Sequence, residues 1–171
     1  MTRVVERIGT SESALAIRDV RTARDLASIR RLFREYERSL TTDLCFQDFD
    51  SELADLPGSY SPPGGALLLA RVDGRLAGCA ALRPGPDDDG ELKRLFVRPA
   101  YRRSGLGRAL VDRVVALALA RRYRGISLDT LAEMEAAQRL YRTLGFREIA
   151  PYGERLVPGM KFFRLDLSRI D

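Results

Sequence analysis

The sequence predicts one α/β domain of the α+β type, in which helices flank a central mixed β-sheet of six to seven strands. Three observations lead to this prediction. The chain has 171 residues, of which 45% are hydrophobic, and this suits one domain with a sizeable core. Its first half is rich in hairpin signals, and its second half contains a strand–helix–strand unit. A sheet built from both halves contains antiparallel and parallel strand pairs.

The first half of the chain begins with a polar segment, residues 1–13, which is predicted to be a flexible tail ahead of a single domain over 14–171. Thr22 and Asp25 form a capping box that opens a helix. The buried stripe predicted for this helix comprises Leu26, Ile29, Phe33, Tyr36 and Leu40. The other elements predicted here are a strand over 14–19, a short helix over 46–56, a Pro- and Gly-rich loop over 57–65, and strands over 66–72 and 76–82 joined by a hairpin turn at 73–74.

The second half alternates strands with helices after a polar turn over 84–90. Strands are predicted over 91–97, 126–131, 146–149 and 160–167, and helices over 106–122 and 133–144. The helix over 106–122 has apolar residues on most sides and is therefore expected to be deeply buried.

The composition excludes several kinds of site. Histidine is absent, so a Ser-His-Asp triad, a Cys-His dyad and a His-ligated metal are all excluded. The two cysteines, Cys45 and Cys79, cannot form a zinc site or a disulfide framework, and both are expected to be small buried residues. No metal site is therefore expected.

The charge pattern indicates an affinity for anions. The net charge is +5, and Lys93 and Lys161 are the only lysines, so the positive charge is almost entirely arginine. Arginine suits phosphate recognition, although a coding bias would produce the same composition. The basic residues form no dense block, so nucleic acid is not an expected partner. No membrane span and no signal peptide are recognised, and a cytoplasmic location is expected.

The strongest local signal is the loop Arg102–Arg108, which reads Arg-Arg-Ser-Gly-Leu-Gly-Arg between a strand and a helix. Backbone N–H groups at a helix N-terminus bind anions, and the glycines permit a close approach to the backbone. The segment lacks the Lys-Ser/Thr of a Walker loop and the third glycine of a Rossmann loop. Taken alone, it fits a phosphate site and a simple glycine turn equally well.

The longer segment Val97–Leu110 closely resembles the coenzyme A motif of the GNAT (GCN5-related N-acetyltransferase) superfamily, Arg/Gln-x-x-Gly-x-Gly/Ala, through Arg102, Gly105 and Gly107. Residues 137–146 resemble the second motif of that family. The two motifs occur in the family's order, and the resemblance extends over residues 14–167.

This resemblance implies a GNAT fold that binds acetyl-CoA as a co-substrate where the sheet splays apart. Loop amides would hold the pyrophosphate, and the preceding strand would offer its backbone to pantetheine, with an N–H near Leu95 polarising the thioester carbonyl. The implied cofactor-binding residues are Leu95, Phe96, Val97, Arg102, Arg103, Ser104, Gly105, Leu106, Gly107 and Arg108.

The resemblance also suggests catalytic roles. Tyr141 matches the tyrosine that many family members place beside the sulfur, where it would donate a proton or hold the thiolate. Glu91 matches a catalytic glutamate of histone-type members and is expected to be the base, with Asp129 as the weaker alternative. One departure is Met134, which stands where many members have a pantetheine-binding asparagine.

The acceptor region is less well defined. Its expected lining is Tyr36, Phe46, Phe49, Tyr60, Lys93 and Arg94. A basic pair there would favour an acceptor with a carboxylate or a phosphate. Lys93 and Arg94 are expected on opposite faces of a regular strand, so only one of them would reach the acceptor.

The expected function is therefore acetyl transfer from acetyl-CoA to a primary amine of a small molecule or a protein, by direct attack in a ternary complex. A GNAT-fold module that senses acyl-CoA without catalysis is the alternative. A homodimer is expected from the resemblance alone.

Overall fold

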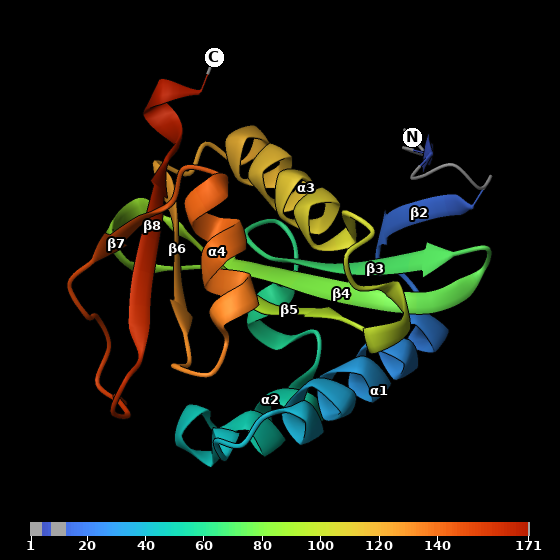
Figure 1. Cartoon of the computed structure of the whole chain (residues 1–171), viewed down its shortest axis with the longest axis horizontal. Helices are drawn as coiled ribbons and strands as arrows, with labels where there is room; N and C mark the ends of the chain where they lie inside the picture. The colour runs from blue at the N-terminus through green and yellow to red at the C-terminus, as the bar shows by residue number, and fades with distance from the viewer. Residues whose placement is uncertain (1–4, 8–12, 171) are drawn as a thin grey trace.

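The computed structural model describes residues 5–7 and 13–170, with the side chains of 5–7, 45 and 46 outside this description. The strands form one eight-stranded sheet in the order β1-β2-β3-β4-β5-β6-β8-β7 (Figure 1). They are β1 (Val5–Arg7), β2 (Ala14–Asp19), β3 (Ala66–Val72), β4 (Arg75–Pro84), β5 (Gly90–Val97), β6 (Gly125–Thr130), β7 (Arg147–Ile149) and β8 (Lys161–Asp166). Since β5 and β6 are parallel and the other neighbours antiparallel, the predicted mixed sheet is confirmed.

The sheet has one strand more than predicted. Val5–Arg7 pairs with Ala14–Ala16, so this part of the segment predicted as a tail is a strand instead. The strand was missed because three residues are too few to show alternation. Residues 1–4 and 8–12, which the tail prediction also included, lie outside the described residues.

Helices cover both faces of the sheet (Figure 1). They are α1 (Ala23–Ser39), α2 (Phe49–Asp55), α3 (Leu106–Ala120) and α4 (Glu135–Thr143). On one face, α1 and α2 pack against alternate strand residues such as Leu67 and Leu69. On the other face, α3 packs against the intervening residues, such as Leu68, and Tyr141 of α4 belongs to the same core cluster. Alternate residues of the central strands therefore serve two separate cores.

The predicted capping box of α1 is confirmed. The Asp25 N–H donates to Thr22 Oγ1 at 3.1 Å, and the Thr22 N–H donates to Asp25 Oδ2 at 3.2 Å. The helix predicted over 46–56 is instead a 3₁₀ turn (Leu44–Gln47) followed by α2. Asp48 between them has φ +53°, a conformation that interrupts a helix.

The prediction that 106–122 is deeply buried is wrong. Only one face of α3 is buried, comprising Leu106, Leu110, Val111, Val114 and Ala118. Leu119 is 38% exposed, and Asp112 and Ala116 are also exposed. Alanine and leucine on the outer face make the helix seem apolar all round, although a surface helix tolerates them. Within the described residues, no helix is both long enough and apolar enough to cross a bilayer.

Two irregularities in β5 shape the site. The registered pairs of β5 with β6 are Gly90–Ile126 and Glu91–Ser127, so the two strands separate after Glu91, as expected for a splayed sheet. On its other edge, Cys79 pairs with Phe96 and Ala81 pairs with Lys93. Ala80 therefore faces two residues of β5, which is a β-bulge, and Arg94 within it has φ +56°.

Candidate active site

A groove of about 730 Å³ runs along the separated end of β5, between the loop before α3 and the start of α4. Its lining includes Leu95, Phe96, Val97, Arg102, Arg103, Gly105, Leu106, Gly107 and Arg108. These are the residues assigned to the cofactor from the sequence, except Ser104. The Ser104 hydroxyl instead donates to the Tyr101 carbonyl at 2.5 Å, which places it outside the groove lining and within the loop itself.

The floor of this groove includes the first turn of α3. Gly105 is the N-cap, with φ +82°, and no side chain caps the helix there. The first-turn N–H groups have no acceptor within the helix, so they are available to an anion. A Cβ on Gly107 would lie 3.4 Å from its nearest neighbour, Leu140 Cδ2, so the interior packing does not require a glycine here. The missing side chain instead leaves the groove open. This arrangement fits a pyrophosphate.

A second cavity, of about 680 Å³, lies at the other half of β5, and we call it the acceptor pocket. It is lined by Gln47, Arg83, Glu91, Lys93, Arg94, Asp129, Tyr152, Arg155, Met160 and Phe162, among others. The segment between β7 and β8 contributes Tyr152 and Met160 and so closes the pocket on its C-terminal side.

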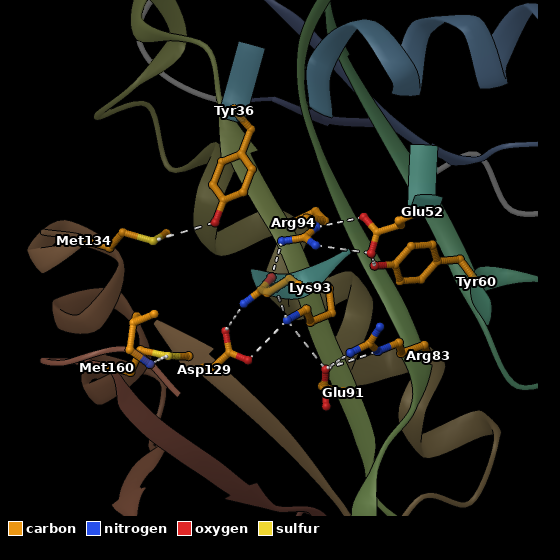
Figure 2. Close-up of polar contacts among 12 residues, drawn as sticks. Tyr36, Glu52, Tyr60, Arg83, Glu91, Lys93, Arg94, Asp129, Met134 and Met160 are labelled. Carbon is orange, nitrogen blue, oxygen red and sulfur yellow. Dashed lines mark hydrogen bonds and ion pairs between the residues drawn. The ribbon is translucent and has the colours of Figure 1, made fainter. Parts of the chain in front are cut away.

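A network of ion pairs crosses the wall of the acceptor pocket (Figure 2). Arg83 donates to Glu91 Oε1 from Nη2 at 2.6 Å and from Nε at 3.2 Å. Lys93 Nζ lies 3.7 Å from the same oxygen and 3.2 Å from Asp129 Oδ2. The Lys93 and Glu91 side chains are only 6% and 7% exposed. Burying so many charges is costly, and such costs are common at functional sites.

Arg94 forms the second part of the network. Its guanidinium donates to both carboxylate oxygens of Glu52, at 2.9 and 3.3 Å, and to Gln47 Oε1 at 2.7 Å. The Tyr60 hydroxyl donates to Glu52 at 2.7 Å, and the Phe49 ring lies 4.9 Å below the guanidinium carbon. Tyr60 and Phe49, which were expected to line the acceptor region, instead support Arg94 from behind, and the Phe46 side chain lies outside the described residues.

The bulge corrects the prediction that only one of Lys93 and Arg94 reaches the acceptor. A regular strand would send these neighbours to opposite faces. Because Arg94 adopts the left-handed conformation, both side chains line the acceptor pocket. Figure 2 shows the polar contacts that each of them makes. No sequence pattern marks this bulge, since it depends on the pairing with β4.

A small cavity of about 20 Å³ shares lining residues with both the groove and the acceptor pocket, and we call it the joining cavity. It shares Tyr36, Leu95 and Met134 with the groove, and Lys93, Arg94 and Asp129 with the acceptor pocket. Tyr141 lines this joining cavity and neither of the larger ones. The separated strands thus bring the predicted tyrosine and three charged groups together.

Burial shifts the pKa values of the titratable side chains that line the joining cavity. It raises the pKa of Tyr36 to about 12, and it raises the pKa of the Tyr141 phenol well above its usual range. Both phenols carry their protons at neutral pH even at an ordinary pKa of about 10. The raised pKa makes them weaker acids, which suits them to donate a hydrogen bond to a sulfur. Burial also lowers the pKa of Lys93, against the opposing effect of Asp129.

The two carboxylates expected to act as the base, Glu91 and Asp129, line different cavities. Glu91 lines the acceptor pocket but not the joining cavity, whereas Asp129 lines both. Sequence reasoning missed Gln47, Glu52 and Arg83, which have no motif and reach the site through tertiary contacts. Met134 packs with the Tyr36 hydroxyl 3.7 Å from its sulfur, at the place expected for an asparagine. In the part of the chain that the structure describes, no group of three His, Cys, Asp or Glu side chains could hold a metal ion.

Solved structures share this fold. A GNAT-family acetyltransferase from Staphylococcus aureus superposes with a TM-score of 0.71 at 24% identity, covering 90% of this chain and 99% of that one. The PaiA N-acetyltransferase from Thermoplasma acidophilum, solved in complex with coenzyme A, has a TM-score of 0.69 at 18% identity, with coverage of 89% and 98%.

Sequence comparisons identify the family. An uncharacterised N-acetyltransferase of Schizosaccharomyces pombe is 36% identical over 159 residues, which is 92% of this chain and 98% of that protein. Human N-acetylaspartate synthetase is 34% identical over 134 residues, which is 77% of this chain but only 41% of that longer protein. The model of the acetyltransferase (GNAT) family matches residues 26–146. The chain therefore belongs to the GNAT family of acetyltransferases.

Proposed function

We propose that this N-acetyltransferase acetylates the primary amine of a small, carboxylate-bearing acceptor, such as an acidic amino acid. The observation that carries the proposal is the arrangement of the three cavities around β5. A groove suited to a phosphate-bearing cofactor and a pocket with buried cations both adjoin one small cavity, which two tyrosines line.

The groove residues are proposed to hold acetyl-CoA. The first turn of α3 and the arginines Arg102, Arg103 and Arg108 would bind its phosphates. The unpaired edge of β5 from Leu95 to Val97 would bind pantetheine through its backbone. Acetyl-CoA, when bound, supplies an activated acetyl thioester.

Tyr141 and Tyr36 are the proposed proton donors. Both line the joining cavity, and both carry a proton at neutral pH. Tyr36 was expected to line the acceptor region, but it lines the groove and the joining cavity and not the acceptor pocket. Two phenols therefore lie where a thiolate would leave.

The acceptor pocket supports a zwitterionic acceptor because it carries both signs of charge. Asp129 would attract an ammonium group beside the joining cavity, and Arg83, whose side chain is 32% exposed, would pair with a carboxylate farther out. Human N-acetylaspartate synthetase, by its name, makes the acetylated form of an acidic amino acid, and its similarity supports the same class here. Glu91 remains a proposed catalytic residue, at the outer end of the network between Arg83 and Lys93.

The test is thiol release from acetyl-CoA with L-aspartate and L-glutamate, compared with their amides and with polyamines. The carboxylates are expected to give a KM about tenfold or more below that of the amides, since a charged hydrogen bond contributes about 1.5–3 kcal/mol. Arg83→Gln should remove this preference without changing the affinity for acetyl-CoA. Arg71→Gln is the control, because Arg71 contacts the hairpin turn at Gly74 and not the pocket.

Equal KM values for the acids and their amides would reject the acceptor class. Binding of acetyl-CoA without thiol release for any amine would instead favour the acyl-CoA-sensing module. The proposal also includes a cytoplasmic location and a homodimer, which rest on the sequence expectations given above.

A further inference from the structure

We infer that Lys93 takes the proton from the acceptor amine, with Asp129 holding its side chain at the joining cavity. This inference rests on the proposed function and adds the group that makes the amine nucleophilic. Tyr141 remains the proposed proton donor to the thiolate, and Glu91 remains part of the ion-pair network in the acceptor pocket.

The location of Lys93 is the first argument. Among the described residues, the side chains that line both the acceptor pocket and the joining cavity are Lys93, Arg94 and Asp129. A proton acceptor must reach the amine at the point where it meets the acetyl group. Arg94 cannot serve, because a guanidinium does not lose its proton in proteins and this one is bound to Glu52. Lys93 and Asp129 are left, 3.2 Å apart.

The chemistry of the two groups is the second argument. An alkylammonium has an ordinary pKa of about 10 and a carboxylic acid one of about 4, so transfer between them is strongly uphill. A lysine amine is much closer in basicity to the acceptor amine. It becomes an effective base when burial destabilises its charged form.

The surroundings of Lys93 are the third argument. On β5 it faces Glu91 and Arg94, on β4 Arg83, and on β6 Asp129. Tyr36 of α1 and Tyr141 of α4 line the same joining cavity, and Tyr152 lines the acceptor pocket. All three phenols are neutral at pH 7, and burial raises their pKa values further. Burial and the two arginines lower the pKa of Lys93, and the two carboxylates oppose them.

The proton balance is complete without another reactant. The acceptor ammonium gives one proton to neutral Lys93, and the resulting Lys93 ammonium is stabilised by Asp129 and Glu91. The free amine nitrogen bonds to the acetyl carbon, the carbon–sulfur bond breaks with its electron pair on sulfur, and the second nitrogen proton passes through the tyrosines to that sulfur. Lys93 then returns its proton to solvent in the acceptor pocket.

The experiment uses the fact that the chain has only two lysines. The full-length protein is labelled with ¹⁵Nζ,¹³Cε-lysine, the Lys161 signal is assigned with Lys161→Arg, and both signals are titrated. Lys93 is expected to titrate below the ordinary pKa of a lysine, because burial lowers its pKa. The rise of kcat/KM with pH should follow the Lys93 titration.

Variants complete the test. Lys93→Arg keeps the charge but cannot release a proton, so kcat should fall about 100-fold or more while acetyl-CoA affinity stays unchanged. Lys93→Met should behave alike, and Lys161→Arg, the matched control, should keep full activity. Asp129→Asn should move the Lys93 titration to still lower pH, because it removes an opposing negative charge.

A Lys93→Arg variant with kcat within threefold of wild type would overturn the inference. So would a Lys93 signal that stays protonated throughout the rise in kcat/KM, and this titration decides the matter even if the variants fail to fold. Thiol release by the wild-type protein tests the proposed function separately, so the two failures are distinguishable.

Discussion

At the scale of single residues, protonation states organise the site. Tyr36 and Tyr141 are protonated at neutral pH, as any phenol with a pKa of about 10 is, and burial raises their pKa values further. Burial lowers the pKa of Lys93 and so favours its neutral form. One desolvated cavity therefore holds donors and an acceptor together. The sequence predicts Tyr141 by its motif and Lys93 as a lining residue of the acceptor region. It does not predict that Lys93 and Arg94 share one pocket, because the strand alternation rule does not foresee the bulge at Arg94.

The Tyr141→Phe variant tests the donor role. The ring packs against Phe146 and Phe163, at centroid distances of 5.5 and 6.2 Å, and phenylalanine preserves these contacts. Removing only the hydroxyl should lower kcat about 100-fold and leave the acetyl-CoA Kd unchanged.

Tyr36→Phe is the matched variant, since Tyr36 lines the same cavity from α1. A larger loss there than in Tyr141→Phe would make Tyr36 the principal donor. Wild-type turnover in Tyr141→Phe would remove Tyr141 from the mechanism.

At the scale of elements, sequence patterns correctly predict the features that depend on residues close together in the chain. The capping box, the hairpin at Asp73-Gly74 and the loop before α3 all lie where expected. The short helix over 46–56 is the exception, because Asp48 turns the chain with a positive φ that residue type alone does not require. The exposed face of α3 was also missed, since alanine is compatible with either environment.

The Gly107→Val variant tests the element that binds the cofactor. A Cβ at this position meets only Leu140 and Val97 side chains, at 3.4 and 3.9 Å, so the fold should tolerate it. The larger side chain would fill the groove over the first turn of α3. We expect the acetyl-CoA Kd, measured by calorimetry, to rise about tenfold or more, at a cost of about 1.4 kcal/mol per factor of ten.

Ala116→Val on the exposed face of α3 is the control and should bind acetyl-CoA normally. Unchanged affinity in a folded Gly107→Val protein would show that the loop is only a turn.

At the scale of the whole molecule, the site depends on contacts between distant segments. The acceptor pocket combines residues from Gln47 to Phe162, an assembly that no window of sequence reveals. The fold class was predictable because two motifs mark the family. The residues that line the acceptor pocket could be identified only from the tertiary structure. Arg98 is another contact between distant segments. It follows β5 and donates hydrogen bonds of 2.7 and 2.8 Å to Glu35 of α1.

The Glu35→Gln variant tests this long-range pair by its pH dependence. The Arg98 guanidinium lowers the pKa of the Glu35 carboxyl below its ordinary value of 4.5. The stabilisation is therefore present above pH 4.5 and is lost as the pH falls through the lowered native value. We expect a loss of about 1 kcal/mol in unfolding free energy at pH 7, allowing for partial exposure, and a smaller difference below pH 4.

Urea unfolding at several pH values measures this difference. Glu135→Gln, in an exposed pair with Arg139, should have little effect at any pH. A loss for Glu35→Gln that is constant down to pH 3 would contradict the ionic origin.

The bulge at Arg94 also bears on how such a protein can evolve. Leu92 faces the core beneath α3, yet Phe96, four positions later, faces the core beneath α1. The extra residue of the bulge therefore exchanges the two faces of the strand between these positions. A one-residue deletion between them would exchange the two faces of the cofactor half. A substitution at Glu91, by contrast, changes the lining of the acceptor pocket and not that of the groove or the joining cavity. Within β5, the acceptor contacts can therefore change by substitution, while the face turned to acetyl-CoA is fixed by the number of residues in the strand.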